Sequence, residues 1–146
     1  MILVSCVAVS GPSVCTAWGD PHYITLDGGT YDFQGDCRYT LVRDCPESPD
    51  LPSFHVIAKN IKRSPGARVA FTRDVTLHLG ESVYSLLSGG EVRINGSTAT
   101  LPVSLPDGVR ISSSGIAVVS VLSLVFNLGW SFELLPTLYL SLLYFV

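Results

Sequence analysis

The sequence of 146 residues has few charged side chains, and this shortage excludes one large class of function. Charged residues make up 14% of the chain, whereas soluble domains contain about 25%. The net charge is −3, and the only basic cluster lies in residues 59–63. Nucleic-acid binding normally needs a set of Lys and Arg side chains that meets the phosphates. We therefore expect no nucleic acid among the partners of this protein.

The sequence also lacks the spacings that carry most catalytic and metal chemistry. No nucleophile-elbow motif is present, so nothing marks a serine hydrolase. The cysteines form no C-x-x-C pair, and the histidines show no metal-ligand spacing. The residues concerned are Cys6, Cys15, Cys37, Cys45, His22, His55 and His78. We predict that the protein is not an enzyme, and a solvated or satisfied role is the default for each histidine.

The cysteines are even in number and occur in a polar segment rich in glycine and proline. This pattern favours disulfide bonds and an oxidising compartment. The candidates Cys6, Cys15, Cys37 and Cys45 allow three full pairings, and spacing does not choose among them. Asn95-Gly96-Ser97 matches the acceptor for N-glycosylation at Asn95. Both features predict a secreted, extracellular glycoprotein.

Composition divides the chain into three parts. Residues 1–12 are an N-terminal extension, residues 13–115 an ordinary globular segment, and residues 116–146 an apolar tail whose only charged side chain is Glu133. A membrane-spanning helix needs about 20 apolar residues, and Gly129, Glu133 and Pro136 interrupt the tail before that length. The tail allows an apolar helix, and it raises an alternative function, that of a membrane-anchored extracellular interaction protein.

Strand patterns fill the segment from Trp18 to Ile111. Phe54, Val56 and Ala58 fall on one face of an expected strand, because side chains alternate between the two faces. Turn signals separate such segments about every ten residues. The turns are expected at Asp27-Gly28-Gly29, Gly89-Gly90 and Asn95-Gly96. Short strands at this interval predict an all-β, antiparallel and sandwich-like fold.

The peptide bond between Asp20 and Pro21 is chemically weak. The Asp20 carboxyl can attack its own main-chain carbonyl, and the prolyl nitrogen is a good leaving group. His22 is a neighbouring proton source at neutral or mildly acid pH, and Gly19 lets the backbone bend toward attack. Residue types alone still favour the plainer interpretation, in which Gly-Asp-Pro starts a turn.

Aspartates are frequent between residues 20 and 44, and carboxylate oxygens are the ligands that calcium prefers. They are Asp20, Asp27, Asp32, Asp36 and Asp44. Their spacing does not match the helix-flanked calcium loop. From spacing alone, turn and surface positions are favoured over a metal site.

The ordered motifs of residues 15–41 resemble the opening of a von Willebrand factor type D domain. They are Cys15, Gly19-Asp20-Pro21-His22-Tyr23, Thr25-Leu26-Asp27-Gly28, Tyr31-Asp32-Phe33-Gln34-Gly35 and Cys37-Arg38-Tyr39-Thr40-Leu41. The resemblance covers residues 15–115 and is closest to mucin-like and adhesive members of the family. Leu26 departs from it, because an aromatic residue is usual there.

The resemblance implies an extracellular, disulfide-linked β module of a mucus, matrix or adhesive protein. Its partners would be extracellular proteins or glycoproteins, in an assembly linked by disulfides. Family members with Gly-Asp-Pro-His undergo self-cleavage between Asp and Pro, which maps onto Asp20 and Pro21 with His22 adjacent. Family domains also hold calcium through the Asp of a Thr-Phe-Asp-Gly motif, which maps onto Asp27.

The chain departs from the family pattern in its second half. The downstream Cys-Gly-x-Cys-Gly-Asn motif is absent, and no cysteine follows Cys45. In the family, the cysteines that match Cys15, Cys37 and Cys45 pair with partners in that half, and the other calcium ligands also belong to it. We therefore expect an incomplete module in which residues 116–146 replace the later strands and the calcium loop.

Overall fold

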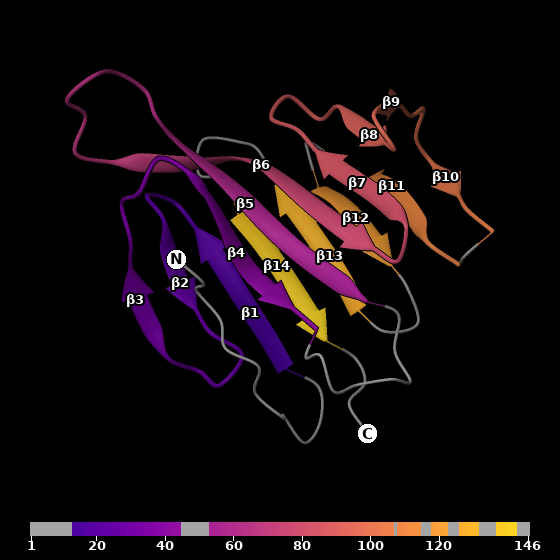
Figure 1. The fold of residues 1–146 in the computed structure, drawn as a ribbon, viewed down its shortest axis with the longest axis horizontal. Helices are drawn as coiled ribbons and strands as arrows, with labels where there is room; N and C mark the ends of the chain where they lie inside the picture. The colour runs from indigo at the N-terminus through magenta and orange to yellow at the C-terminus, as the bar shows by residue number, and fades with distance from the viewer. Residues whose placement is uncertain are drawn as a thin grey trace.

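The described part of the chain consists of two antiparallel β-sheets that pack face to face (Figure 1). The computed structural model describes residues 13–44, 53–106, 108–114, 118–122, 126–131 and 137–142. These residues contain fourteen strands and no helix. The expected all-β, antiparallel, sandwich-like fold is confirmed.

The larger sheet has eight strands in the order β10-β11-β12-β13-β14-β1-β2-β3. They are β1 (Ser13–Trp18), β2 (His22–Ile24), β3 (Thr30–Asp32), β10 (Val103–Ser104), β11 (Arg110–Ser114), β12 (Val118–Leu122), β13 (Phe126–Ser131) and β14 (Thr137–Leu142). The first and last described strands, β1 and β14, therefore both belong to this sheet and lie side by side.

The smaller sheet has six strands in the order of the sequence, from β4 to β9. They are β4 (Arg38–Arg43), β5 (Phe54–Lys62), β6 (Ala70–Leu79), β7 (Ser82–Leu86), β8 (Val92–Ile94) and β9 (Ser97–Thr98). In β5, Phe54, Val56 and Ala58 are at most 2% exposed. The three side chains that the sequence pattern grouped on one face therefore form the inward face of this strand.

A bulge breaks the strict alternation in β4. Its register against β5 shifts between Thr40 and Val42. Because a bulge sets two residues opposite one, the neighbours Leu41 and Val42 are both buried. A strict alternation that buries Tyr39 and Leu41 would place Val42 on the opposite face, so the bulge accounts for its burial.

The hydrophobic core lies between the two sheets. Leu77, Tyr84 and Leu86 of the smaller sheet are fully buried, and Ala17 and Ile111 of the larger sheet belong to the same cluster. Burying an apolar side chain of the larger kind contributes about 1.5–3 kcal/mol to stability. The interior thus exists only when the two sheets are packed together.

The tail, residues 116–146, is where the sequence expectation and the structure differ. Its described residues form β12, β13 and β14 rather than a helix. β14 pairs with β13 on one side and β1 on the other, so neighbouring strands satisfy its backbone polar groups. The helical expectation is wrong for the described residues, because local composition does not show which distant strands are available as partners.

The described residues include no helix of sufficient length and apolar character to cross a membrane. The domain boundaries placed at residues 12 and 115 stay predictions.

Candidate functional site

The candidate site is the tight turn that joins β1 to β2. Gly19 has a φ of +65°, a backbone conformation that residues with a Cβ rarely adopt. Asp20 and Pro21 follow it, and β2 begins at His22. The Phe33 N–H donates to the Pro21 carbonyl at 3.3 Å, which fixes the turn against the segment after β3. The fragile peptide bond therefore lies in a bend whose shape is set by tertiary contacts.

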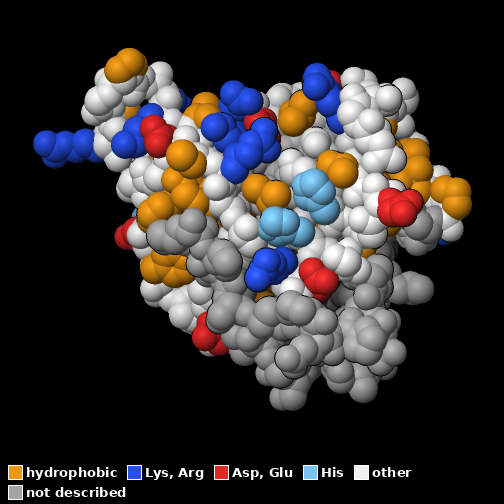
Figure 2. Space-filling view, viewed as in Figure 1, with side chains coloured by type: hydrophobic (Ala, Val, Ile, Leu, Met, Phe, Trp, Pro, Cys, Tyr) orange, Lys and Arg blue, Asp and Glu red, His pale blue; other side chains and the backbone are white. Residues whose placement is uncertain are grey.

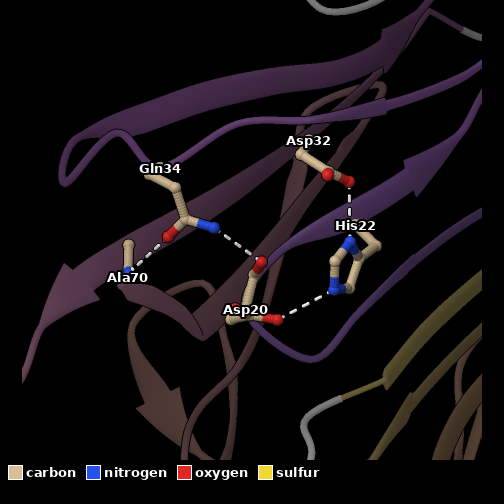
Figure 3. A network of polar contacts seen from close by, with 5 residues as sticks. All are labelled: Asp20, His22, Asp32, Gln34 and Ala70. Carbon is tan, nitrogen blue, oxygen red and sulfur yellow. Dashed lines mark hydrogen bonds and ion pairs between the residues drawn. The ribbon is translucent and has the colours of Figure 1, made fainter. Parts of the chain in front are cut away.

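His22 lies between two carboxylates (Figure 3). Its Nε2 is 2.8 Å from Oδ1 of Asp20, and its Nδ1 is 2.6 Å from Oδ1 of Asp32. The antiparallel register of β2 and β3 sets His22 directly opposite Asp32. Both ring nitrogens are thus engaged, so the ring is held in one orientation beside the Asp20 side chain.

These carboxylates change the electrostatics of His22. Its pKa is raised above the ordinary value, first by the hydrogen bond to Asp32 and further by the negative charges of Asp32 and Asp20. Desolvation opposes this rise but does not cancel it. The imidazolium form therefore persists to higher pH than in a free histidine. A charged proton donor next to the Asp20-Pro21 bond is the chemical consequence.

Gln34 reaches the main chain of the same turn from the segment that follows β3. Its Nε2 donates to the main-chain carbonyl of Asp20 at 2.7 Å. Its Oε1 accepts the N–H of Ala70, the first residue of β6, at 2.7 Å. Figure 3 shows the two bonds leaving opposite sides of one amide group. The carbonyl of the weak bond therefore has a side-chain donor that is anchored to the other sheet.

The arrangement brings together the parts that a peptide cleavage needs. In chemical terms, the Asp20 carboxylate can act as a nucleophile, the Asp20 carbonyl accepts a hydrogen bond that would polarise it, and His22 can donate a proton. Sequence reasoning found Asp20, Pro21 and His22 but missed Asp32 and Gln34. The hairpin register could have indicated Asp32, whereas no local pattern indicates Gln34.

The candidate calcium ligand, Asp27, lies in the exposed turn between β2 and β3. The Thr25 hydroxyl donates to its carboxylate. Its pKa is lowered, first by that bond and then by the backbone N–H groups of Asp27 and Gly29. The carboxylate is therefore used within its own turn.

Calcium takes about six to eight oxygen ligands. Among the residues that the structure describes, no three His, Cys, Asp or Glu side chains gather in a way that could hold a metal ion. Asp36 and Asp44 lie before and after β4 of the smaller sheet, whereas the turn of Asp27 joins two strands of the larger sheet. Calcium binding through Asp27 therefore stays a prediction.

The described cysteines have contrasting surroundings. Cys15 is buried, and burial raises the pKa of its thiol to about 12. Cys37 is exposed, and no disulfide joins the two. Cys6 and Cys45 lie outside the described residues, so the pairing of all four stays a prediction.

Asn95 lies at the tip of the β8–β9 hairpin. Asn95 and Gly96 have φ values of +50° and +85°, as a two-residue type I′ turn requires. The Asn95 Oδ1 accepts the Val83 N–H at 2.8 Å, and the residue is exposed. This exposed turn is compatible with glycosylation, which stays a prediction.

The fold brings two histidines together that are far apart in the sequence. His55 and His78 face each other on β5 and β6, with ring centroids 6.0 Å apart, and Figure 2 shows a pair of histidines side by side on the surface. The His55 Nε2 shares a hydrogen bond with Thr40 Oγ1 at 2.8 Å. Burial, then the positive neighbours, lower the pKa of His55. The default expectation of a satisfied histidine describes His55 well.

Comparison with known proteins identifies the same family that the sequence motifs resemble. The family profile of the von Willebrand factor type D domain matches residues 15–144. IgGFc-binding protein of Homo sapiens is 42% identical over 134 residues, which is 88% of this chain and 2% of that protein. Alpha-tectorin of Homo sapiens is 39% identical over 117 residues, or 77% of this chain and 5% of that protein.

Mucin-2 of Homo sapiens is 33% identical over 111 residues, which is 72% of this chain and 2% of that protein. The chain therefore spans between 2% and 5% of the length of these relatives. What is similar is one module of very large proteins.

Proposed function

The chain belongs to the family of von Willebrand factor type D domains, and on that basis we propose that it is a non-catalytic structural or adhesive module of a secreted, mucin-like glycoprotein. The long match to a mucin and to alpha-tectorin supports this function. Its partners would be extracellular proteins or glycoproteins, joined in part through disulfides.

Non-reducing peptide mapping of the secreted protein tests the compartment and the disulfides together. We expect oxidised cysteines and a glycan on Asn95. A protein that accumulates in the cytosol with all thiols reduced would contradict the proposal.

The second part of the proposal is that the module cleaves its own Asp20-Pro21 bond. The observation that carries it is the placement of His22 between the carboxylates of Asp20 and Asp32, at 2.8 and 2.6 Å. This geometry favours the protonated form of the imidazole beside the weak bond. The reaction is a single self-processing event and involves no external substrate.

The proposed reaction is a hydrolysis in two steps. An Asp20 carboxylate oxygen forms a bond to its own main-chain carbonyl carbon, and the carbon–nitrogen bond to Pro21 breaks. The departing electron pair stays on the Pro21 nitrogen, which takes a proton supplied by His22. Water then opens the cyclic anhydride of Asp20 to give two carboxyl groups. One water molecule is consumed overall.

Incubation of the intact chain at pH 5–6, followed by sequencing of any new N-terminus, tests self-cleavage. We expect a fragment that begins at Pro21. The variant Asp20→Ala should stay intact, because it lacks the nucleophile, while Asp27→Ala serves as a matched control that should still cleave. A wild-type chain that remains whole after long incubation would overturn this part of the proposal.

The membrane-anchored alternative rests on the composition of residues 116–146 and stays a prediction. Retention in membranes after carbonate extraction would support it. Calcium binding through Asp27 likewise stays a prediction, which titration with calcium would test.

A further inference from the structure

We propose that Gln34 is a catalytic residue of the self-cleavage, in which its amide N–H stabilises the negative charge that develops on the Asp20 carbonyl oxygen. This inference rests on the self-cleavage proposed above and assigns a new role within that site. Gln34 already contacts a reacting atom, because its Nε2 lies 2.7 Å from the carbonyl oxygen of the bond to be broken.

The orientation of the Gln34 amide follows from its second contact. The Ala70 N–H is a donor, so the side-chain atom that faces it at 2.7 Å must be the acceptor Oε1. The amide nitrogen then points to the other side, where the Asp20 carbonyl oxygen is an acceptor. Only one of the two amide orientations satisfies both partners. The donor is therefore fixed before the reaction starts.

The chemistry of the first step explains why a donor at this position matters. When the Asp20 carboxylate attacks, the carbonyl oxygen passes from a neutral carbonyl to an oxyanion. A hydrogen bond to the charged form is roughly twice as strong as one to the neutral form. The contact thus stabilises the transition state more than the ground state, which is the condition for catalysis. Loss of one such donor typically slows acyl transfer by about 100- to 1,000-fold.

The anchor of Gln34 also makes the site depend on the packing of the two sheets. The turn that contains Asp20 joins β1 to β2 of the larger sheet and His22 begins β2, whereas Ala70 begins β6 of the smaller sheet. The chain around Gln34 is held by the edge-to-face contact of Phe33 and Tyr39, whose ring centroids are 4.9 Å apart. The oriented donor therefore forms only after the sheets have packed. We expect cleavage to follow folding rather than to precede it.

The experiment compares first-order cleavage rates of the full chain and its variants over a range of pH. Gln34→Leu removes the donor at similar volume and should slow cleavage by about 100-fold or more. Gln34→Glu keeps the acceptor for the Ala70 N–H but replaces the donor with a carboxylate that repels the oxyanion. Its rate relative to wild type should rise as the pH falls, because protonated Glu regains an O–H donor.

The matched control is Asn95→Asp, the same change from amide to carboxylic acid in an exposed turn of the other sheet. It should cleave at the wild-type rate, and thermal unfolding should show that each variant is folded. Equal rates for wild type, Gln34→Leu and Gln34→Glu, with Asp20→Ala inactive, would overturn the role of Gln34 while self-cleavage stands. If the cleavage rate of Gln34→Glu is reduced by the same factor at every pH, Gln34 has a structural role, and its proposed catalytic role is overturned as well. An intact wild-type chain would overturn both proposals.

Discussion

At the scale of single residues, the weak bond depends on what its neighbours do. Any Asp-Pro pair carries the same intrinsic chemistry, but this one is flanked by a histidine whose two nitrogens are both engaged. In the proposed cleavage Asp20 supplies the attacking carboxylate, and Asp32 raises the pKa of His22 from the opposite strand. The proposed reactivity thus depends on the side chains of Asp20, His22 and Asp32. The first two belong to one sequence motif and the third belongs to another.

The pH dependence of cleavage follows from the direction of the His22 shift. The rate needs ionised Asp20 and protonated His22, so it should follow a bell-shaped profile. The alkaline limb reports the raised pKa of His22. Asp32→Asn removes the negative charge while keeping an acceptor oxygen, so the pKa of His22 falls and the alkaline limb moves to lower pH.

Cleavage assays of wild type and Asp32→Asn between pH 4 and 8 check this prediction. Asp36→Asn is the matched control, since it makes the same change in an exposed residue of the same segment. An alkaline limb that stays in place in Asp32→Asn would contradict the electrostatic role of Asp32.

At the scale of elements, a buried polar network ties the two sheets together. Asn60 on β5 is fully buried, and its Nδ2 donates to the Tyr23 hydroxyl of β2 at 2.9 Å. Its Oδ1 accepts the Thr72 hydroxyl of β6 at 3.0 Å, and its N–H donates to the Cys37 carbonyl at 2.9 Å. A buried polar side chain is tolerated only when its groups are paired, and here the pairing crosses the core.

Truncating Asn60 should therefore destabilise the fold. Asn60→Ala leaves the buried hydroxyls of Tyr23 and Thr72 without this partner, and each unsatisfied group costs about 1–3 kcal/mol. We expect a loss of about 2–4 kcal/mol in the free energy of unfolding, measured by chemical denaturation. Thr100→Ala, which removes an exposed hydroxyl, is the control. A loss in Asn60→Ala no larger than that of the control would show that the network contributes no stability.

The strands were largely predictable, and the reason is local. Alternation with a period of two residues grouped the side chains of one face of β5, because successive side chains point to opposite faces of a sheet. The bulge that buries Val42 was not predictable from that pattern. It depends on how β4 registers against β5, which is a relation between two segments.

At the scale of the whole molecule, the two ends of the described chain complete one sheet. β14 lies between β13 and β1 and pairs with each through six residue positions. Figure 1 shows β1 and β14 side by side, although β2 to β13 lie between them in the sequence. The apolar tail thus supplies a strand that the first part of the chain needs.

Removal of residues 137–146 should disrupt the larger sheet. The truncation deletes β14 and leaves β1 and β13 with unpaired edges. At about 0.5–1.5 kcal/mol for each net hydrogen bond, the lost pairing is comparable with a total stability of about 5–15 kcal/mol. We expect a loss of cooperative unfolding and fast amide exchange in β1.

Hydrogen exchange and thermal unfolding of the truncated chain check this prediction. A shorter truncation that removes residues 143–146 keeps β14 and is the control. Protection of the β1 amides that survives removal of residues 137–146 would contradict the pairing.

The sequence by itself determined the β-strands between residues 18 and 111, the turns rich in glycine, the family likeness and the weak Asp20-Pro21 bond. All of these depend on residue types within a few positions of one another. Tertiary structure alone decided that Asp32 faces His22, that Gln34 joins the Asp20 carbonyl to Ala70, and that the tail forms strands. These contacts depend on strand register and on the packing of two sheets. Both relate segments that are far apart in the sequence, so local residue patterns do not determine them.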